Sequence, residues 1–163
     1  MSLNLKKSAL SIVVATAIFA TGCSSNQPPM PTYNPMAPAT YSGSMDNYVN
    51  GIEPTEQIGG TFKTLLSETT NGITRYAGEV TRAPGQRSVV HYMTYTVTSC
   101  VIKGQATLVL EGTDPQTFKA GECYTMPAGV KGYIANRGKT TLKLLDVNTM
   151  PAGASSMVML EQH

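Results

Sequence analysis

The stretch GQRSVVHYMTYTVTSCVIKG, from Gly85 to Gly104, carries the strongest fold signal of this chain. Its middle part, residues 89–101, is rich in Val, Thr and Tyr, which favour the half-buried surface of a pleated sheet. The tripeptide Ala83-Pro84-Gly85 just before it combines proline and glycine, as turns commonly do. The stretch therefore predicts strand structure that follows a tight turn and is bounded by glycine at both ends.

Strand patterns also flank this stretch on both sides. Residues 73–81 alternate in polarity, and the Asn71-Gly72 pair before them is a strong signal for a two-residue hairpin turn. Further segments that predict strands are residues 61–66, 105–110 and 140–147. No window has sustained helical periodicity, so the sequence predicts an all-β sandwich or barrel.

A second stretch, GECYTMPAGVKGYIAN from Gly121 to Asn136, forms a pair with the first. Together the two stretches resemble the paired motifs of the cupin family, without an insertion or a deletion. The framework residues of that family are all present: Gly85, Gly104, Gly121, Pro127, Gly129 and Asn136. The resemblance implies a single double-stranded jelly-roll β-barrel, which we place at residues 61–150, with residues 151–163 as a C-terminal tail or edge strand.

The metal-ligand positions of the resembling family are mostly vacated in this chain. The resemblance places these positions at His91, Met93, Val97 and Gly132. Valine cannot coordinate a metal and glycine has no side chain to do so. One imidazole and one thioether do not hold Fe(II), Mn(II) or Ni(II), which prefer nitrogen and oxygen donors. We therefore expect no family-type metal site and no cofactor.

A softer metal site is the alternative interpretation of the same residues. His91, Met93, Met126 and the cysteines could offer nitrogen, thioether and thiolate donors, and sulfur ligands suit Cu(I). The simpler interpretation is that the two methionines fill the barrel as adaptable core residues. Cys100 and Cys123 are expected to be two buried thiols, with a disulfide as the alternative in an oxidising compartment.

The predicted ligand pocket consists of five residues of the two motifs: His91, Met93, Tyr95, Tyr124 and Met126. Apolar side chains with a few polar groups are typical of small-molecule sites. Which of them point inward depends on strand register, because a slip of one residue reverses the face. His91 is also the candidate catalytic residue, as a general acid or base.

The N-terminal residues predict export and a lipid anchor. Lys6 and Lys7 precede an apolar stretch, residues 9–20, that is shorter than the about 20 residues a membrane-spanning helix needs. The sequence Thr21-Gly22-Cys23 that follows resembles the lipobox of bacterial lipoproteins. The resemblance implies a signal peptide at residues 1–22 and acyl chains such as palmitate on Cys23. An ordinary secretory peptide cleaved nearby is the alternative.

The residue after the predicted lipidated cysteine bears on location. Ser24 stands where an aspartate would retain a lipoprotein in the inner membrane of Gram-negative bacteria. The resemblance to lipoproteins therefore implies the outer membrane, with the domain facing the periplasm. The membrane is then one expected partner, reached through the lipid on Cys23.

Residues 23–60 predict a disordered tether between anchor and barrel. From Ser24 to Gly60 the chain has six of its ten prolines and few aliphatic side chains, so it cannot bury enough apolar surface to offset its ordering entropy. Removal of residues 1–22 lowers the formal net charge from +2 to zero, and no Lys/Arg cluster remains. Nucleic acid is therefore not an expected partner, whereas a small molecule, a glycan or a second copy in a homodimer is.

Two classes of function fit these features. The first is a metal-free module of the cell envelope that binds a small ligand or has a structural role. The second is a metal-independent cupin enzyme that acts on a sugar or small organic substrate with His91 as acid or base. The first is favoured because neither motif gives His91 a carboxylate partner, since Glu122 belongs to the turn after Gly121.

The lipobox resemblance makes a direct prediction about Cys23. Bacteria grown with a palmitate analogue should incorporate the label into the wild-type protein but not into the Cys23→Ser variant, because only the thiol can accept the lipid. Fluorescence of the labelled band on a gel measures incorporation. Equal labelling of both proteins would contradict the assignment.

Overall fold

The computed structural model describes residues 36–161, so the predicted signal peptide, Cys23 and the first part of the tether lie outside the described residues. Within this range, no helix is long and apolar enough to cross a membrane. The strands are β1 (Gln57–Ile58), β2 (Thr61–Thr70), β3 (Ile73–Arg82), β4 (Gln86–Arg87), β5 (His91–Met93), β6 (Val97–Lys103), β7 (Gln105–Leu110), β8 (Gln116–Lys119), β9 (Cys123–Met126), β10 (Lys131–Ala135), β11 (Leu142–Pro151) and β12 (Met157–Met159).

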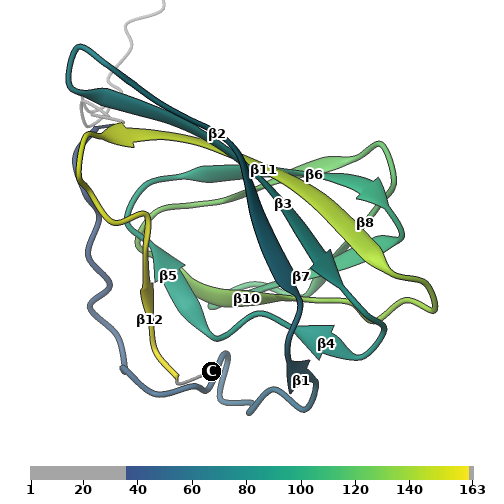
Figure 1. Cartoon of the computed structure of the whole chain (residues 1–163). Coiled ribbons are helices and arrows are strands. Elements are labelled where there is room, and N and C mark those ends of the chain that lie inside the picture. Colours follow the sequence, from purple (N-terminus) through teal and green to yellow (C-terminus); the bar gives the residue numbers. More distant parts are fainter. Residues whose placement is uncertain (1–35, 162–163) are drawn as a thin grey trace, which may run out of the picture. The chain divides into compact units, whose positions relative to one another are not determined.

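The strands form two sheets that face each other (Figure 1). One sheet has the order β2-β3-β11-β6-β9. The other has the order β1-β4-β10-β5-β12, and β7 joins it by pairing with both β10 and β8. From β9 to β12 successive strands alternate between the sheets, so residues close in sequence reach both inner faces. The predicted all-β double-stranded jelly roll is confirmed.

The hairpin between β2 and β3 forms as its turn residues predict. Asn71 has φ 52° and Gly72 has φ 75°, and two central residues with positive φ are the signature of the turn that matches strand twist. β2 is an exposed edge strand throughout, with Phe62 stacked on Tyr76 at a ring-centroid distance of 5.9 Å. The hairpin thus extends one sheet beyond the barrel (Figure 1).

An apolar cluster joins the two sheets at one end of the barrel. Its members are Val80, Val101, Ala106, Leu108, Tyr124, Ile134, Leu142 and Leu144. They come from strands of both sheets, and each is less than 9% exposed. Burial of such side chains contributes about 1.5–3 kcal/mol for each large aliphatic residue. This cluster is therefore the main source of stability between the sheets.

Residues 36–56, which we call the strap, lie against the outer face of the seven-stranded sheet (Figure 1). Val49 is 2% exposed and packs with Val109 and Tyr133. The composition of residues 23–60 predicts a disordered tether, and the described part of that segment differs from this expectation. A few long-range contacts fix the strap despite its proline-rich composition.

Lys131 makes the principal polar contact between the barrel and the strap. Its ammonium donates to Asp46 Oδ1 and to the Ser44 carbonyl, both at 3.0 Å, and lies 3.5 Å from Glu111 Oε1. Desolvation alone would lower the Lys131 pKa, but the hydrogen bond to Asp46 and the charge of Glu111 outweigh it and raise the pKa. The buried ammonium therefore stays charged and holds the strap.

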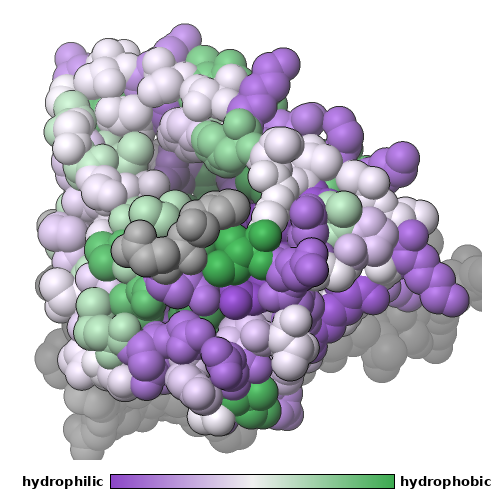
Figure 2. Space-filling view, turned by 60° about the horizontal axis from the view of Figure 1, so that its bottom comes forward, coloured by the Kyte–Doolittle hydropathy of each residue, from purple (hydrophilic) through white to green (hydrophobic). Residues whose placement is uncertain are grey.

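Figure 2 turns the lower side of Figure 1 toward the reader. On this side apolar residues form small groups between hydrophilic ones rather than one broad apolar area. A scattered distribution of this kind is ordinary for a protein surface. The apolar outer face of the sheet, by contrast, is buried where Val49 of the strap covers Val90 and Val109.

Cys100 and Cys123 form a disulfide, which corrects the expectation of two buried thiols. The two residues lie directly opposite each other on β6 and β9, with their Cα atoms 4.0 Å apart. Val101 N donates to Glu122 O, so the adjacent cysteine pair takes the closer, non-hydrogen-bonded position of an antiparallel ladder. That position brings two cysteines within bonding reach, and only the register could show it.

Reducing this disulfide is expected to lower the free energy of unfolding by about 3 kcal/mol, because the bond closes a loop in the unfolded chain. The two cysteines are separated by 23 residues in sequence. Urea unfolding with and without a phosphine reductant measures the change. The Cys100→Ser/Cys123→Ser double variant should have the free energy of unfolding of the reduced protein, and the reductant should not change it. Unchanged unfolding of protein proved reduced by thiol labelling would contradict this expectation.

Candidate functional site

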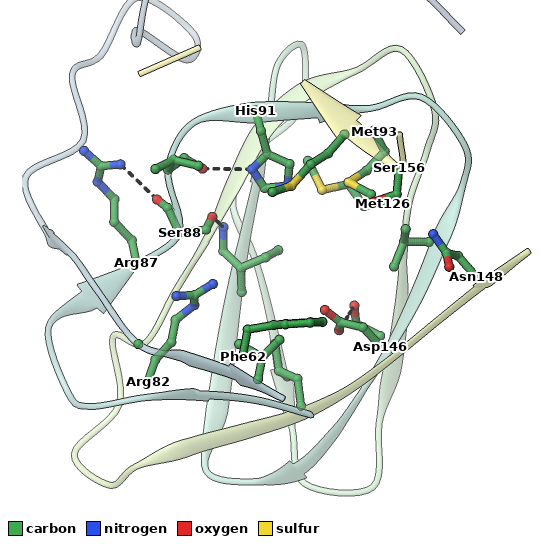
Figure 3. A pocket seen from close by; sticks show the side chains of 18 of the residues that line it. Phe62, Arg82, Arg87, Ser88, His91, Met93, Met126, Asp146, Asn148 and Ser156 are labelled. Atoms are coloured by element: carbon green, nitrogen blue, oxygen red, sulfur yellow. Dashed lines mark hydrogen bonds between the residues drawn. The ribbon is translucent and has the colours of Figure 1, made fainter. Parts of the chain in front are cut away.

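A cavity of about 550 Å³ lies between the sheets beside the apolar cluster (Figure 3). The five-stranded sheet contributes alternate residues of its strands, since side chains at every second position share a face. From β3 these are Tyr76, Val80 and Arg82, and from β11 they are Leu144, Asp146, Asn148 and Met150. The volume is in the range of small-molecule sites. The strand alternation thus places polar and apolar groups on one wall.

The seven-stranded sheet supplies the opposite wall. His91 and Met93 of β5 line the cavity, and β12 adds Met157 and Met159. Met126 of β9 reaches the same region from the five-stranded sheet and packs with Met93. In Figure 3 the side chains of Met93 and Met126 lie beside the His91 ring. This part of the cavity is therefore lined by thioethers around one imidazole.

The His91 ring has a defined orientation. Its Nδ1 lies 2.8 Å from the Val89 carbonyl oxygen. Because a carbonyl only accepts hydrogen bonds, Nδ1 carries the proton and Nε2 keeps its lone pair. Burial lowers the His91 pKa, and the nearby charge of Arg82 also lowers it, although the bond to Val89 and the charge of Glu161 oppose this. The imidazole is therefore neutral at pH 7, with Nε2 available as an acceptor.

Arg82 and Asp146 place opposite charges at different points of the cavity. Arg82 is opposite Leu142 and Asp146 is opposite Gly78 in the β3–β11 ladder, so four residue steps, about 13 Å along the strands, separate them. Burial lowers the Arg82 pKa, whereas burial raises the Asp146 pKa against the lowering effects of Ser99 and Arg82. Ser99 Oγ donates to Asp146 Oδ1 at 2.6 Å. The cavity thus has two polar ends.

Several buried polar atoms of the cavity wall have no hydrogen-bond partner within residues 36–161: Arg82 Nε, Tyr124 Oη and Asn148 Oδ1. Tyr124 is opposite Ser99 in the β6–β9 ladder, but its hydroxyl completes no hydrogen bond of normal geometry. Burial raises the Tyr124 pKa, and so does the charge of Asp146, so the hydroxyl keeps its proton as a donor. Unpaired buried groups of this kind are rare in native proteins and call for a specific explanation.

Four of the five predicted pocket residues line the cavity: His91, Met93, Tyr124 and Met126. Tyr95 is 4% exposed but is not among the lining residues. β5 ends at Met93 and β6 begins at Val97, so Tyr95 lies in the bend between them. The alternation that would have placed Tyr95 on the same face as Met93 therefore stops at Met93.

Sequence reasoning missed Arg82, Asp146, Asn148, Met157 and Met159, which also line the cavity. Asp146 had a usable signal, because it continues the inward-facing series of Leu142 and Leu144 on a predicted strand. The two methionines of β12 had none, since their place depends on pairing with β5. Arg87 and Lys131 belong to the two motifs, and Arg87 also lines the cavity. Their charged groups are paired with Glu161 and Asp46 respectively.

Gly132 shows why one vacated ligand position cannot simply regain a histidine. A Cβ at this residue would lie 2.3 Å from the Val109 carbonyl oxygen and 2.8 Å from a Leu110 side-chain carbon. Gly132 is paired with His91 on one side and with Leu110 on the other. The close approach of β7 therefore requires glycine. Among residues 36–161, no cluster of three or more His, Cys, Asp or Glu side chains could hold a metal ion.

The comparisons with known proteins agree with this architecture. The family described as "Cupin domain" matches residues 78–148. Comparison with curated proteins finds no match. An uncharacterised Klebsiella pneumoniae protein with a double-stranded β-helix domain is 22% identical, with a TM-score of 0.50 over 74% of this chain and 97% of that one. The DMSP lyase DddQ of Ruegeria pomeroyi is 15% identical, with a TM-score of 0.52 over 64% of this chain and 56% of that one. A cupin-like protein of Thermotoga maritima is 16% identical, with a TM-score of 0.50 over 60% of this chain and 73% of that one.

Replacing Asp146 with Asn is expected to stabilise the protein at pH 7 and to change its stability little at pH 3. Burial raises the Asp146 pKa above 3.8, so the folded state holds this proton more tightly than the unfolded chain does. The resulting penalty is absent below the unfolded pKa and grows as the pH rises to the folded pKa. Urea unfolding at both pH values measures the difference.

The exposed residue Asp114 provides the matched control for this prediction. Asp114→Asn makes the same chemical change outside the cavity and should not reproduce the gain at pH 7. A loss of stability in Asp146→Asn that is equal at pH 3 and pH 7 would mean that the carboxyl has only a packing role.

Proposed function

Because the described barrel is a cupin domain with a double-stranded β-helix fold, we propose that this protein is a lipid-anchored envelope protein whose barrel binds a small hydroxylated organic acid. The observation that carries the proposal is the set of unpaired buried atoms in the cavity wall: Arg82 Nε, Tyr124 Oη and Asn148 Oδ1. Leaving each of them unpaired costs about 1–3 kcal/mol. A ligand that pairs with them recovers this free energy on binding.

The chemistry of these atoms defines the ligand class. Arg82 Nη1 already donates to the Gly59 carbonyl, so the other N–H groups of its guanidinium are the donors left for a ligand. A guanidinium pairs best with a carboxylate. Tyr124 offers a hydroxyl donor, whereas Asn148 Oδ1 and the Asp146 carboxylate accept hydrogen bonds. One molecule that carries a carboxylate and several hydroxyl groups complements all of them. The thioether-lined part of the cavity accommodates its carbon skeleton by apolar contact.

The protonation state and the hydrogen-bond partner of His91 favour ligand binding over acid–base catalysis. A general acid needs a proton to give at the working pH, and burial lowers the pKa of this imidazole. Its Nδ1 partner is the Val89 carbonyl rather than a carboxylate that would stabilise a positive charge. The neutral ring instead offers Nε2 as a hydrogen-bond acceptor. The metal-independent enzyme with His91 as acid or base is the alternative function.

The proposed location rests on the N-terminal sequence. The resemblance of Thr21-Gly22-Cys23 to a lipobox supports an acylated cysteine and an outer-membrane anchor facing the periplasm. The disulfide between Cys100 and Cys123 supports the same assignment, because disulfides persist in oxidising compartments such as the periplasm. The exposed edge strand β2, with Phe62, Leu65 and Leu66 exposed, supports a homodimer formed by strand pairing.

The ligand proposal is tested with the full chain in detergent and a panel of hydroxy acids, uronic acids and neutral sugars. Thermal shift identifies a binding acid, and calorimetric titration then compares Arg82→Gln with the wild type. Loss of a charge-assisted hydrogen bond should weaken an acid about 10- to 100-fold, because such a bond is worth about 1.5–3 kcal/mol. The corresponding neutral amide should bind both proteins equally.

Arg75 provides the matched control, because it lies on the same strand with an exposed side chain. Arg75→Gln should leave the affinity unchanged. Tyr124→Phe removes a single hydroxyl from the wall and serves as a second variant if Arg82→Gln does not fold. Acids that bind all of these variants with wild-type affinity, or a preference for neutral sugars, would overturn the proposal.

A further inference from the structure

The β5–β12 ladder gathers a histidine and three methionines on one face. Antiparallel pairing places Met159 opposite His91 and Met157 opposite Met93. His91 and Met93 are two residues apart and therefore share a face, as do the two methionines of β12. Directly opposed residues have Cβ atoms about 4.5–5.5 Å apart. All four side chains line the cavity, so the imidazole shares one face of its sheet with three thioethers.

A further thioether faces this group from the other sheet. Met126 of β9 lines the cavity and packs with Met93 and Val97. Figure 3 shows the side chains of Met93 and Met126 beside the His91 ring. Met93 and Met126 are buried, at 7% and 3% exposed. Thioether side chains from both sheets therefore lie beside the imidazole.

Filling of the core does not explain all of these methionines. Methionine often fills irregular gaps in apolar cores, where it is buried. Met157 is 39% exposed and Met159 is 59% exposed, although both line the cavity. They therefore stand at its rim, opposite Met93 and His91. The flexible thioethers at the rim and the buried thioethers inside therefore line an entry path that ends beside the His91 imidazole.

The orientation of His91 suits a metal ligand. Histidines that bind metals usually donate their other ring N–H to a carbonyl or carboxylate, which fixes the tautomer and the ring. His91 Nδ1 makes such a bond to Val89 O at 2.8 Å, leaving the Nε2 lone pair for a ligand.

We propose that His91 Nε2 and the thioethers of Met93 and Met126 bind a Cu(I) ion, with Met157 and Met159 guarding the entry. Thioether sulfur selects soft ions such as Cu(I), and imidazole also binds copper. All of these donors are neutral, so a monovalent ion brings less uncompensated charge into the buried site than a divalent ion would. This site uses the same methionine-lined part of the cavity and the same Nε2 that the proposed organic acid would contact, so the two ligands should exclude each other. The Cu(I) experiment uses no organic acid, so its outcome is separate from that of the ligand panel.

The disulfide excludes the two cysteine sulfurs as ligands of the proposed Cu(I) ion. Cys100 and Cys123 are bonded to each other, and they alternate with Ser99 and Tyr124, whose side chains face the cavity. Both sulfurs therefore lie on the outer side of the sheet and are unavailable as thiolates. The donors are instead the imidazole and thioether of β5 and the thioether of β9, with the methionines of β12 at the entry. The site is thus an imidazole–thioether site, selective against Zn(II) and Ni(II).

The test is a competition for Cu(I) between the full chain in detergent and the coloured chelator bicinchoninate, without oxygen and with a non-thiol reductant. The wild type should withdraw one equivalent of Cu(I) from the chelator. The double variant Met93→Leu/Met126→Leu keeps the side-chain volume but removes both sulfurs. It should bind at least 10-fold more weakly. Zn(II) and Ni(II) offered at the same concentration should not be retained by the wild type.

Met45→Leu is the matched control, because Met45 is 57% exposed and lies in the strap outside the cavity. It should leave Cu(I) binding unchanged. A second readout uses methionines labelled with ¹³C at the methyl group and Ag(I) as a redox-inert probe, with shifts confined to the methionines of the cavity. Equal Cu(I) affinity in the wild type and the double variant, or an equal loss in Met45→Leu, would overturn the proposal.

Discussion

The packing of the apolar cluster between the sheets is the interaction on which the rest of this structure depends. Leu142 and Leu144 of β11 are almost completely buried, and so are Val101 of the neighbouring strand β6 and Ala106 of β7 in the opposite sheet. Several members of the cluster also form part of the cavity wall: Val80, Tyr124, Ile134 and Leu144. The cavity is therefore the unfilled continuation of the core, and the packed half holds its walls in place.

The division of the barrel interior into a packed half and a cavity explains how the barrel tolerates buried polar groups that have no hydrogen-bond partner. Arg82 Nε and Asn148 Oδ1 each reduce the stability of the empty protein. The packed half offsets that loss, which natural proteins commonly accept where function requires it. Lys131 shows the opposite arrangement, because its buried ammonium has partners in Ser44 and Asp46. The cavity wall thus combines paired groups, such as Asp146 with Ser99, with unpaired atoms, whereas the Lys131 ammonium has partners in the strap.

The fold was predictable because its signals are local. Gly85, Gly104, Gly121 and Gly129 all have positive φ, so the spacing of the framework glycines records where the chain must turn. Four predicted pocket residues followed from that spacing. Tyr95 did not, because the end of β5 interrupts the alternation.

The features that escaped prediction depend on contacts between distant parts of the chain. The pairing of Met159 with His91 and the contact of Asp46 with Lys131 leave no periodic pattern in the sequence. The disulfide required a register that places Cys100 opposite Cys123. The composition of the strap did not predict that it packs against the barrel, because proline-rich segments usually lack the apolar surface to do so. In this chain Val49 supplies that apolar surface.

The position of the strap along the chain has a mechanical consequence. A pulling force applied N-terminal of residue 36 reaches the strap before it reaches either sheet. The strap is held by separate point contacts, such as those of Asp46 and Asn50, which break one after another when peeled. The long β3–β11 ladder, in contrast, resists shear with many hydrogen bonds loaded together. Peeling residues 36–56 would release about 70 Å of extended chain, so the strap would act as an extensible element while the barrel stays folded.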